Sequence, residues 1–499
     1  MPTAIRFCNR VLCTGTAAFV LLALLMAVQT VSAQAPFVIL TQISTDTFTN
    51  NTSMHATEVE PDTYAVGNTI VSVFQVGRFT DGGSSDIGFS TSTDGGTTWT
   101  HGNLPGITKV EGTGKYDRAT DPAIVFDVKH QLWLAEVLAM SEAGGPHGAA
   151  VLVSSSTDGI TWKNPATVSV VEPGGFYDKP WIGCDNTASS HFYGNCYVEW
   201  DDFAQGDLIQ MSTSKDGGKT WGAKKTAGNA AGTGGIPLVQ PNGTVIVPLD
   251  DPFESSVMAF KSTNGGTSWT TPVTFAVINQ HGVGGGMRAF PLIAAQIDGA
   301  GTVYVAWADC SFRAGCASND IVMSSSTDGT TWTAPSRIPI DAVSSTVDHF
   351  IPGFAVDTTT SGSTARIALT YYFFPLANCT SNCKLGVGYI TSTTGGATWS
   401  RAKKLSRGVN PNWLPTTSSG QMVGDYMSLS FPGGKVHGVF AEATAPVGST
   451  LNESMFTNAA GLADAAEEEM LFSSQNDKPV PNAHSDVPRR TSPYHEDGR

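Results

Sequence analysis

The stretch Ser90–Trp99, STSTDGGTTW, recurs five more times in related form, and this recurrence decides the fold. The later copies are SSSTDGITW ending at Trp162, STSKDGGKTW at Trp221, KSTNGGTSW at Trp269, SSSTDGTTW at Trp332 and TSTTGGATW at Trp399. Successive tryptophans are 48 to 67 residues apart. Repeats of this length, with short alternating segments and glycine-rich turns, are typical of small antiparallel sheets repeated around an axis. The sequence therefore predicts an all-β fold, a β-propeller.

Each copy has the composition of a tight turn between two strands. The central Asp can accept hydrogen bonds from backbone N–H groups of its own turn, and the Gly residues supply positive φ angles. The Trp begins the returning strand, where its ring can pack between neighbouring sheets. Asn264 and Thr394 replace the Asp in two copies, so we expect those turns to be held less tightly. The aspartates that we interpret as structural are Asp94, Asp158, Asp216 and Asp328.

The repeated motif resembles the Asp-box, or bacterial neuraminidase repeat, of the sialidase superfamily. This resemblance implies four-stranded antiparallel blades, with the boxes far from the active site. The resemblance in architecture extends over nearly all of the chain after residue 33. The expected function is that of a secreted, sialidase-like protein that acts on glycans.

The number of blades follows from the strands between the motifs. Apolar strands such as TIVSVFQV (69–76) precede the boxes, and a seventh, KVHGVFAEA (435–443), follows the last box. The segment FVILTQIST (37–45) belongs to no unit of its own and has the pattern of a closing strand. We therefore predict seven blades closed by the N-terminal strand, with six as the alternative. Closure leaves no open sheet edge.

The two ends of the chain differ in composition from the repeats. Residues 1–33 combine Arg6 and Arg10 with an apolar run and small residues before Gln34, which is typical of a secretory signal. No later apolar stretch is long enough to span a bilayer. We therefore expect a signal peptide over 1–33, a propeller over 34–458 and a disordered polar tail over 459–499. The expected location is periplasmic or extracellular.

Cysteine usage and charge narrow the class of protein further. Six cysteines after the signal fall into three local pairs, which predicts disulfides in an exported chain. The formal net charge is −15 and the expected propeller segment has no Lys/Arg cluster, which argues against nucleic acid as a partner. We expect a monomer that binds carbohydrate and needs neither metal nor cofactor. The predicted pairs are Cys184 with Cys196, Cys310 with Cys316, and Cys379 with Cys383.

Polar residues gather where the first strand of each unit begins. These innermost strands line the channel of a propeller, so we expect the chemistry at the face where they start. Taken singly, each such residue is more often a turn cap or a structural ion pair; the constellation as a whole favours a polar-ligand site. The candidates for substrate binding are Arg118, Arg288, Arg78, Lys179, Asp178, His349 and Asp425.

The resemblance also implies catalytic roles. Sialidases hold the substrate carboxylate with three arginines and use a Tyr nucleophile, which avoids placing a carboxylate against an anionic sugar. By resemblance, Arg118 and Arg288 are carboxylate ligands and Tyr426 is the nucleophile. Its candidate partners are Glu254 and Glu199, and the candidate acids are Asp121 and Asp117.

Two departures from the family keep other functions open. The Arg-Ile-Pro motif of sialidases is absent near the N-terminus, and no third arginine stands at a first-strand start unless Arg78 or Lys179 substitutes. A propeller that only binds carbohydrate or protein needs no acid pair. A polysaccharide lyase would use His349 or Tyr426 as its base. Whether the chain is an enzyme stays undecided by its sequence.

Overall fold

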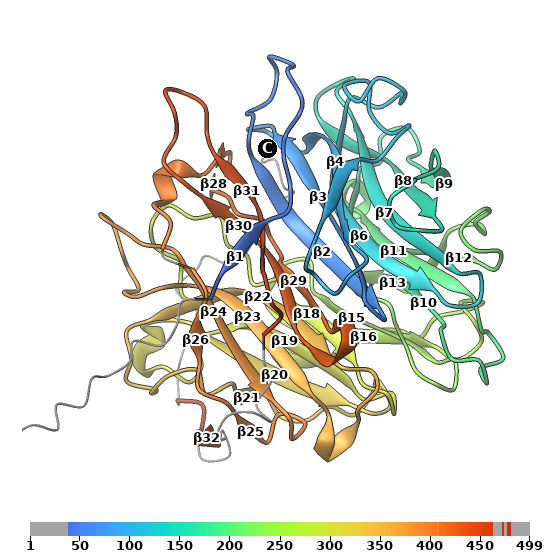
Figure 1. Cartoon of the computed structure of the whole chain (residues 1–499). Helices are drawn as coiled ribbons and strands as arrows, with labels where there is room; N and C mark the ends of the chain where they lie inside the picture. Colours follow the sequence, from blue (N-terminus) through green and yellow to red (C-terminus); the bar gives the residue numbers. More distant parts are fainter. Residues whose placement is uncertain (1–37, 407, 463–471, 474–476, 481–499) are drawn as a thin grey trace, which may run out of the picture. The chain divides into compact units, whose positions relative to one another are not determined.

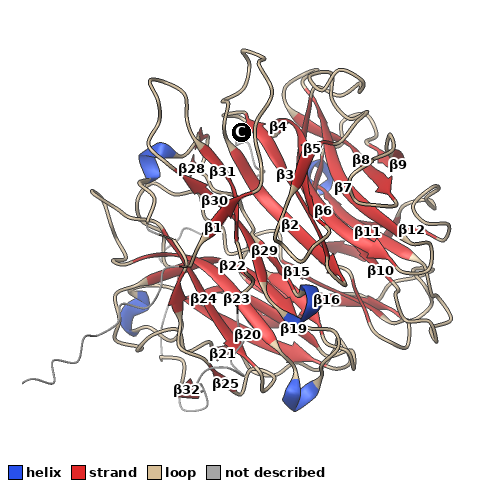
Figure 2. Cartoon of the chain, in the orientation of Figure 1, coloured by secondary structure: helices blue, strands red, loops and turns tan. Residues whose placement is uncertain are grey.

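The computed structural model describes residues 38–406, 408–462, 472–473 and 477–480. Nearly all regular structure in these residues is antiparallel β-sheet (Figures 1 and 2). The helices in the described part are single turns of 3-10 helix. None of them is long and apolar enough to cross a bilayer. They are η1 (Phe203–Gln205), η2 (Ala314–Cys316), η3 (Gly362–Thr364), η4 (Pro411–Trp413) and η5 (Pro432–Gly434).

The first two repeats form one eight-stranded sheet, in which two groups of four consecutive strands are joined by a single residue pair between Ser84 and Ala119. The first group is β2 (Glu58–Val66), β3 (Thr69–Arg78), β4 (Ser84–Ser92) and β5 (Thr100–Asn103). The second group is β6 (Arg118–Asp127), β7 (Leu132–Ser141), β8 (His147–Ser156) and β9 (Ala166–Val170).

The next four repeats each form a separate four-stranded sheet. The third repeat contains β10 (Tyr177–Cys184), β11 (Cys196–Asp202), β12 (Leu208–Ser214) and β13 (Lys225–Ala231). The fourth contains β14 (Leu238–Val239), β15 (Val245–Asp250), β16 (Ser256–Ser262) and β17 (Val273–Val277). The fifth contains β18 (Ala294–Ile297), β19 (Val303–Asp309), β20 (Asp320–Ser326) and β21 (Ser336–Arg337). The sixth contains β22 (Asp348–Val356), β23 (Ile367–Phe374), β24 (Gly386–Ser392) and β26 (Lys403–Lys404).

The last sheet is completed by the N-terminal strand, as the sequence predicts. Its own strands are β29 (Ser428–Ser430), β30 (His437–Ala443) and β31 (Glu453–Asn458). The strand β1 (Leu40–Gln42) pairs antiparallel with β31, with Leu40 opposite Asn458. First strands of successive repeats contact one another in the order β2, β6, β10, β14, β18, β22, β29 and back to β2.

The first strands share a backbone irregularity at an Xaa-Pro step. Glu60, Asp121, Lys179 and Ile351 each precede a proline and have φ between 45° and 56°. The pairing register of β2, β6, β10 and β22 shifts at these residues. Proline cannot donate to a ladder, so within sheets it is confined to edge strands and bulges. Left-handed backbone is rare outside Gly. Because the same bulge recurs in four first strands, we interpret it as a feature of the repeat and not as an isolated irregularity.

The repeated motif forms the turn that its composition predicts. Asp94 Oδ1 accepts hydrogen bonds from Thr97 N at 3.0 Å and Thr98 N at 2.9 Å. These and the bond from the Thr98 hydroxyl lower the pKa of Asp94 to about 2. The turns with Asn264 and Thr394 keep one such bond each, from Ser268 N and Thr398 N.

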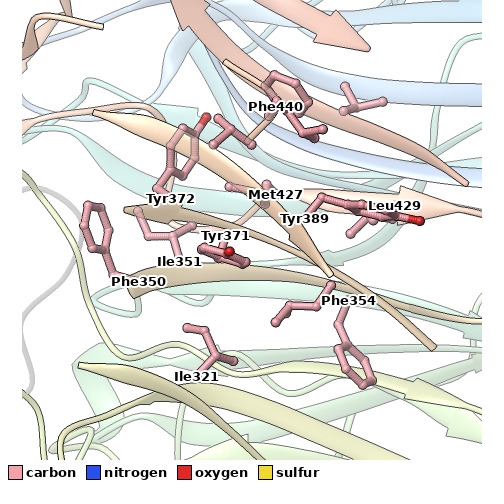
Figure 3. Close-up of a cluster of buried hydrophobic side chains, with 14 of the residues drawn as sticks. Ile321, Phe350, Ile351, Phe354, Tyr371, Tyr372, Tyr389, Met427, Leu429 and Phe440 are labelled. Carbon is pink, nitrogen blue, oxygen red and sulfur yellow. The ribbon is translucent and has the colours of Figure 1, made fainter. Parts of the chain in front are cut away.

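The tryptophans after these turns pack between successive sheets. Trp162 lies against Phe89 of the preceding repeat with ring centroids 5.9 Å apart. Trp332 stacks on Phe275 at 3.9 Å. The largest apolar cluster joins the fifth, sixth and last sheets, with Phe350, Tyr372 and Met427 among its members (Figure 3).

All three predicted cysteine pairs are disulfides. Part of the segment expected to be a disordered tail also lies among the described residues. There β32 (Phe472–Ser473) pairs with β25 (Thr398–Trp399), and Val480 N donates to Ser311 O at 2.7 Å. Asp477 forms an ion pair with Arg337 at 3.2 Å. The expected signal peptide, residues 1–33, lies outside the described residues.

Candidate functional site

Side chains from the bulged first strands meet in a small pocket. Asp121 of β6 and Lys179 of β10 both line it, and Lys179 Nζ lies 3.8 Å from the Asp121 carboxylate. Trp181, two residues after the β10 bulge, forms a further wall. The positive φ of Asp121 and Lys179 gives the two side chains equivalent places in adjacent sheets.

Tyr426 enters the same pocket from the segment before β29. Its hydroxyl donates to the carbonyl of Pro122 at 3.2 Å. Its ring meets Trp181 edge-on, with centroids 5.1 Å apart. Asp62 of β2 also lines the pocket, and its Oδ2 accepts from Ile124 N at 2.8 Å. Burial raises the pKa of Asp62 to about 6. The pocket thus combines two carboxyl groups, one phenol, one amine and one indole.

Asp425 anchors the positive charges beside this pocket. Arg288 binds it in a bidentate pair at 2.8 and 2.6 Å, and Lys179 Nζ lies 2.8 Å from it. Arg288 and Asp425 are only 1% and 2% exposed. Burial by itself raises the pKa of Asp425, but the charges of Arg288 and Lys179 hold it well below its usual range. Arg288 is therefore a structural partner of Asp425 in this geometry.

Further buried acids lie behind the pocket wall. Burial and the charges of Asp121 and Glu199 raise the pKa of Glu136 well above its usual range. Burial does the same for Glu199, whose carboxylate approaches Gly235. Asp178 faces Asp201 across the β10–β11 ladder, and its charge, after burial, raises the pKa of Asp201. Burial therefore favours the protonated form of Glu136, Glu199 and Asp201.

Three predicted site residues lie in other surroundings. Arg118 pairs with Asp81 at 2.6 Å and Glu142 at 2.9 Å. Asp117 pairs with Lys109. Glu254 lies in the turn after β15, where its N–H donates to Asp251 O at 2.9 Å. None of these lines the pocket, and neither do the predicted site residues His349, Arg78, Asp178, Glu199, Arg288 and Asp425.

Arg78 and His349 each lie in a buried polar network. Arg78 Nη1 donates to the Gln75 side chain at 3.1 Å, and Gln75 in turn binds Glu60 and Thr120. Glu60 accepts from Asp425 N at 3.2 Å, so Arg78 joins the pocket's surroundings through two intermediates.

His349 lies near Asp320 and Asp341, a set of donors that fits a metal ion. The guanidinium groups of Arg313 and Arg337 already bind both carboxylates. The cluster therefore carries its positive charge in arginine, and we assign no metal to it.

A hairpin lies over the end of the channel where the first strands begin. Its strands are β27 (Thr416–Thr417) and β28 (Gly420–Gln421), the latter labelled in Figure 1. Arg288 N donates to Gln421 O at 2.9 Å, and Ser418 N donates to Thr80 O at 2.9 Å. The hairpin thus connects the segment before the fifth repeat with the loop after β3 of the first, at the end of the sheets where the first strands begin.

Of the predicted site residues, Asp121, Lys179 and Tyr426 line the pocket, whereas Asp62, which also lines it, and the buried Glu136 were not predicted. The repeated Xaa-Pro step was a signal in the sequence that could have located the pocket. Glu60, Asp121 and Lys179 each precede a proline at the same point of a first strand.

Comparison with known proteins assigns this chain to no family. No family model and no curated protein matches the chain. An ulvan lyase of a polysaccharide lyase family is similar in structure, with 10% identity over 84% of this chain and 95% of that chain and a TM-score of 0.47. A Hadza microbial sialidase has 15% identity over 71% of this chain and 67% of that chain, with a TM-score of 0.42. The intramolecular trans-sialidase of Ruminococcus gnavus has 14% identity over 79% and 91%, with a TM-score of 0.37. Activity has to be argued from the residues themselves.

Proposed function

We propose that this chain is an exported, seven-bladed Asp-box propeller that acts on glycans by glycoside hydrolysis in its central pocket. The observation that carries the proposal is the meeting of Asp62, Asp121, Lys179, Trp181 and Tyr426 in one cavity. The cyclic contacts of the first strands and the bonded Asp turns support the propeller. The three disulfides support export.

The pocket groups suit a double displacement. Tyr426 Oη attacks the anomeric carbon and passes its proton to the Asp121 carboxylate, while protonated Asp62, whose pKa is raised to about 6, gives its proton to the departing glycosidic oxygen. Water then replaces the tyrosine oxygen, Asp62 takes a proton from that water, and Asp121 returns a proton to Tyr426. Lys179 favours the ionised form of Asp121 before the attack, and Trp181 offers an apolar face to the sugar ring.

The second candidate is carbohydrate binding without cleavage. It is favoured by the state of the arginines, because Arg288 is held by Asp425 and Arg118 by Asp81 and Glu142. Neither guanidinium is presented to a ligand as sialic acid recognition would need. A rigid pocket with Trp181 and several hydrogen-bonding groups would still bind a sugar.

The first prediction separates these two functions. Oligosaccharides are screened for both binding and cleavage with the parent protein and the variants Tyr426→Phe and Asp121→Asn. We expect cleavage to fall at least 100-fold in each variant, because loss of an acid–base group costs roughly 10²–10⁴ in rate. Binding should change less than about threefold for Tyr426→Phe, which keeps the ring.

Tyr116→Phe is the matched control, since Tyr116 is half-buried outside the pocket and its substitution should leave cleavage unchanged. Cleavage that survives both pocket substitutions would place the chemistry elsewhere. Binding without any cleavage by the parent would establish the second candidate instead.

A further inference from the structure

The small pocket adjoins a second, larger cavity nearer the ends of the first strands. The pocket has a volume of about 50 Å³, and the larger compartment about 330 Å³. The two share Asp62, Trp181, Ile236 and Gln296 as common walls. Trp181 therefore lies between the small pocket and the larger cavity.

The larger compartment lies where the first strands end. Its remaining walls include Tyr64, Cys184, Val239 and Ile297, at or next to the last residues of β2, β10, β14 and β18. The repeated Asp turns belong to the same face, since Gly95 N, inside the first of them, donates to Asn68 O in the β2–β3 turn. The hairpin β27–β28 covers the opposite end.

The volumes decide where a sugar ring can lie. One water needs roughly 10–15 Å³ by the same measure, so the small pocket has space for a few waters and the larger compartment has space for many more. Most of an oligosaccharide therefore needs the larger compartment, while the small pocket has room for the anomeric centre beside Asp121 and Tyr426.

The charge of the compartment selects the kind of sugar. Asp62 and Asp298 are among its described lining residues, and none of those residues is Lys or Arg. Lys179, at the edge of the small pocket, is neutralised by Asp425 and Asp121. A carboxylate on the ligand would meet this acidic field without a counter-charge. Hydroxyl and ammonium groups would find acceptors in it.

We propose that a neutral or amino-sugar oligosaccharide enters from the face of the Asp turns and lies mainly in the larger compartment, with the reacting anomeric centre at the small pocket. This inference rests on the proposed function for the reaction, but the route and the ligand class are properties of the cavities. The sialoside expected from the resemblance is accordingly a poor ligand.

The route is tested without any sugar. Tyr426→Cys places a thiol in the small pocket, and its reaction rate with a methanethiosulfonate ethylammonium reagent is measured against the parent background. Adding Thr358→Trp, at an exposed position of the larger compartment's rim, should slow the reaction at least tenfold. Gln296→Trp, deeper in the same compartment, is the second blocking variant.

Ser419→Trp is the matched control, because Ser419 is exposed in the hairpin at the other end. It should change the thiol rate less than twofold. A rate that falls for Ser419→Trp and stays unchanged for both compartment variants would overturn the proposed route.

The ligand class is tested by calorimetry with a neutral oligosaccharide, a chitosan oligomer, a sialoside and a uronate oligomer. We expect the first two to bind at least tenfold more tightly than the acidic pair, and Thr358→Trp to weaken their binding at least tenfold. Tighter binding of an acidic ligand would overturn the ligand class.

The two proposals fail in different ways. Neutral binding with no cleavage would refute hydrolysis and leave this inference standing. If no sugar binds but the thiol rates are as expected, the ligand class is refuted and the proposed route still stands.

Discussion

Buried ion pairs hold individual side chains of this molecule in place. Asp425 is buried and binds both Arg288 and Lys179. Removing one partner of a buried pair leaves an uncompensated charge, which costs roughly 3–5 kcal/mol. We therefore predict that Asp425→Asn lowers the free energy of unfolding by about that amount, measured by guanidinium denaturation at pH 7.

Asp81→Asn is the control for this prediction. Asp81 also pairs with an arginine, Arg118, but its side chain is 54% exposed. Exposed pairs contribute less than about 1 kcal/mol. Equal destabilisation by the two substitutions would contradict the role assigned to Asp425.

The raised pKa of Glu58 leads us to predict that the free energy of unfolding depends on pH. Burial raises its pKa to about 8 from the ordinary value of 4.5. The folded state therefore holds the proton more tightly than the unfolded state, and this group's contribution to stability falls as pH rises from about 4.5 to about 8. Glu58→Gln cannot titrate, so the variant should gain stability relative to the parent between pH 5 and pH 8. Thermal unfolding at several pH values measures the difference.

Glu172→Gln serves as the reference for that series, because Glu172 is exposed. Its difference from the parent should stay constant across the same range. A constant difference for Glu58→Gln as well would show that Glu58 is ionised in the folded protein throughout.

At the scale of elements, the pairing of β1 with β31 leads to a prediction about how the last sheet is completed. It supplies the fourth strand of the last sheet by pairing with β31. Deleting residues 34–45 removes that strand and exposes the edge of β31, so the product should aggregate or lose cooperative unfolding. Calorimetry and light scattering detect both effects. Deletion of residues 34–37 alone, which spares β1, should unfold like the protein that begins at residue 34.

The sequence predicted elements where local chemistry determines them. The Asp-Gly turns, the closing strand 37–45 and the three disulfides follow from turn residues, alternation and cysteine spacing, all of which act over a few neighbours. The bulges at Glu60, Asp121 and Lys179 were harder to foresee. Left-handed backbone is rare outside Gly, so the Xaa-Pro dipeptides alone do not predict it.

At the scale of the whole molecule, the site was predicted only in part. Asp121, Lys179, Asp425 and Tyr426 come together because first strands of a repeat protein meet at its axis. Which arginines are free for a ligand depends on partners hundreds of residues away, such as Asp425 for Arg288. The covering hairpin β27–β28 likewise depends on contacts with Gly286 and Thr80 that no local pattern encodes.

The pairing of Leu40 with Asn458 also sets an order of events during biosynthesis. The ribosome makes β1 before any other strand and β31 after almost all of them, so the first strand finished is among the last to find its partner. Until then the chain carries an apolar segment with nothing to pair with, at the end that would leave the cell first. Slow translation or export of the final repeat would prolong that exposure, and partner strands from other copies of the chain would compete for it.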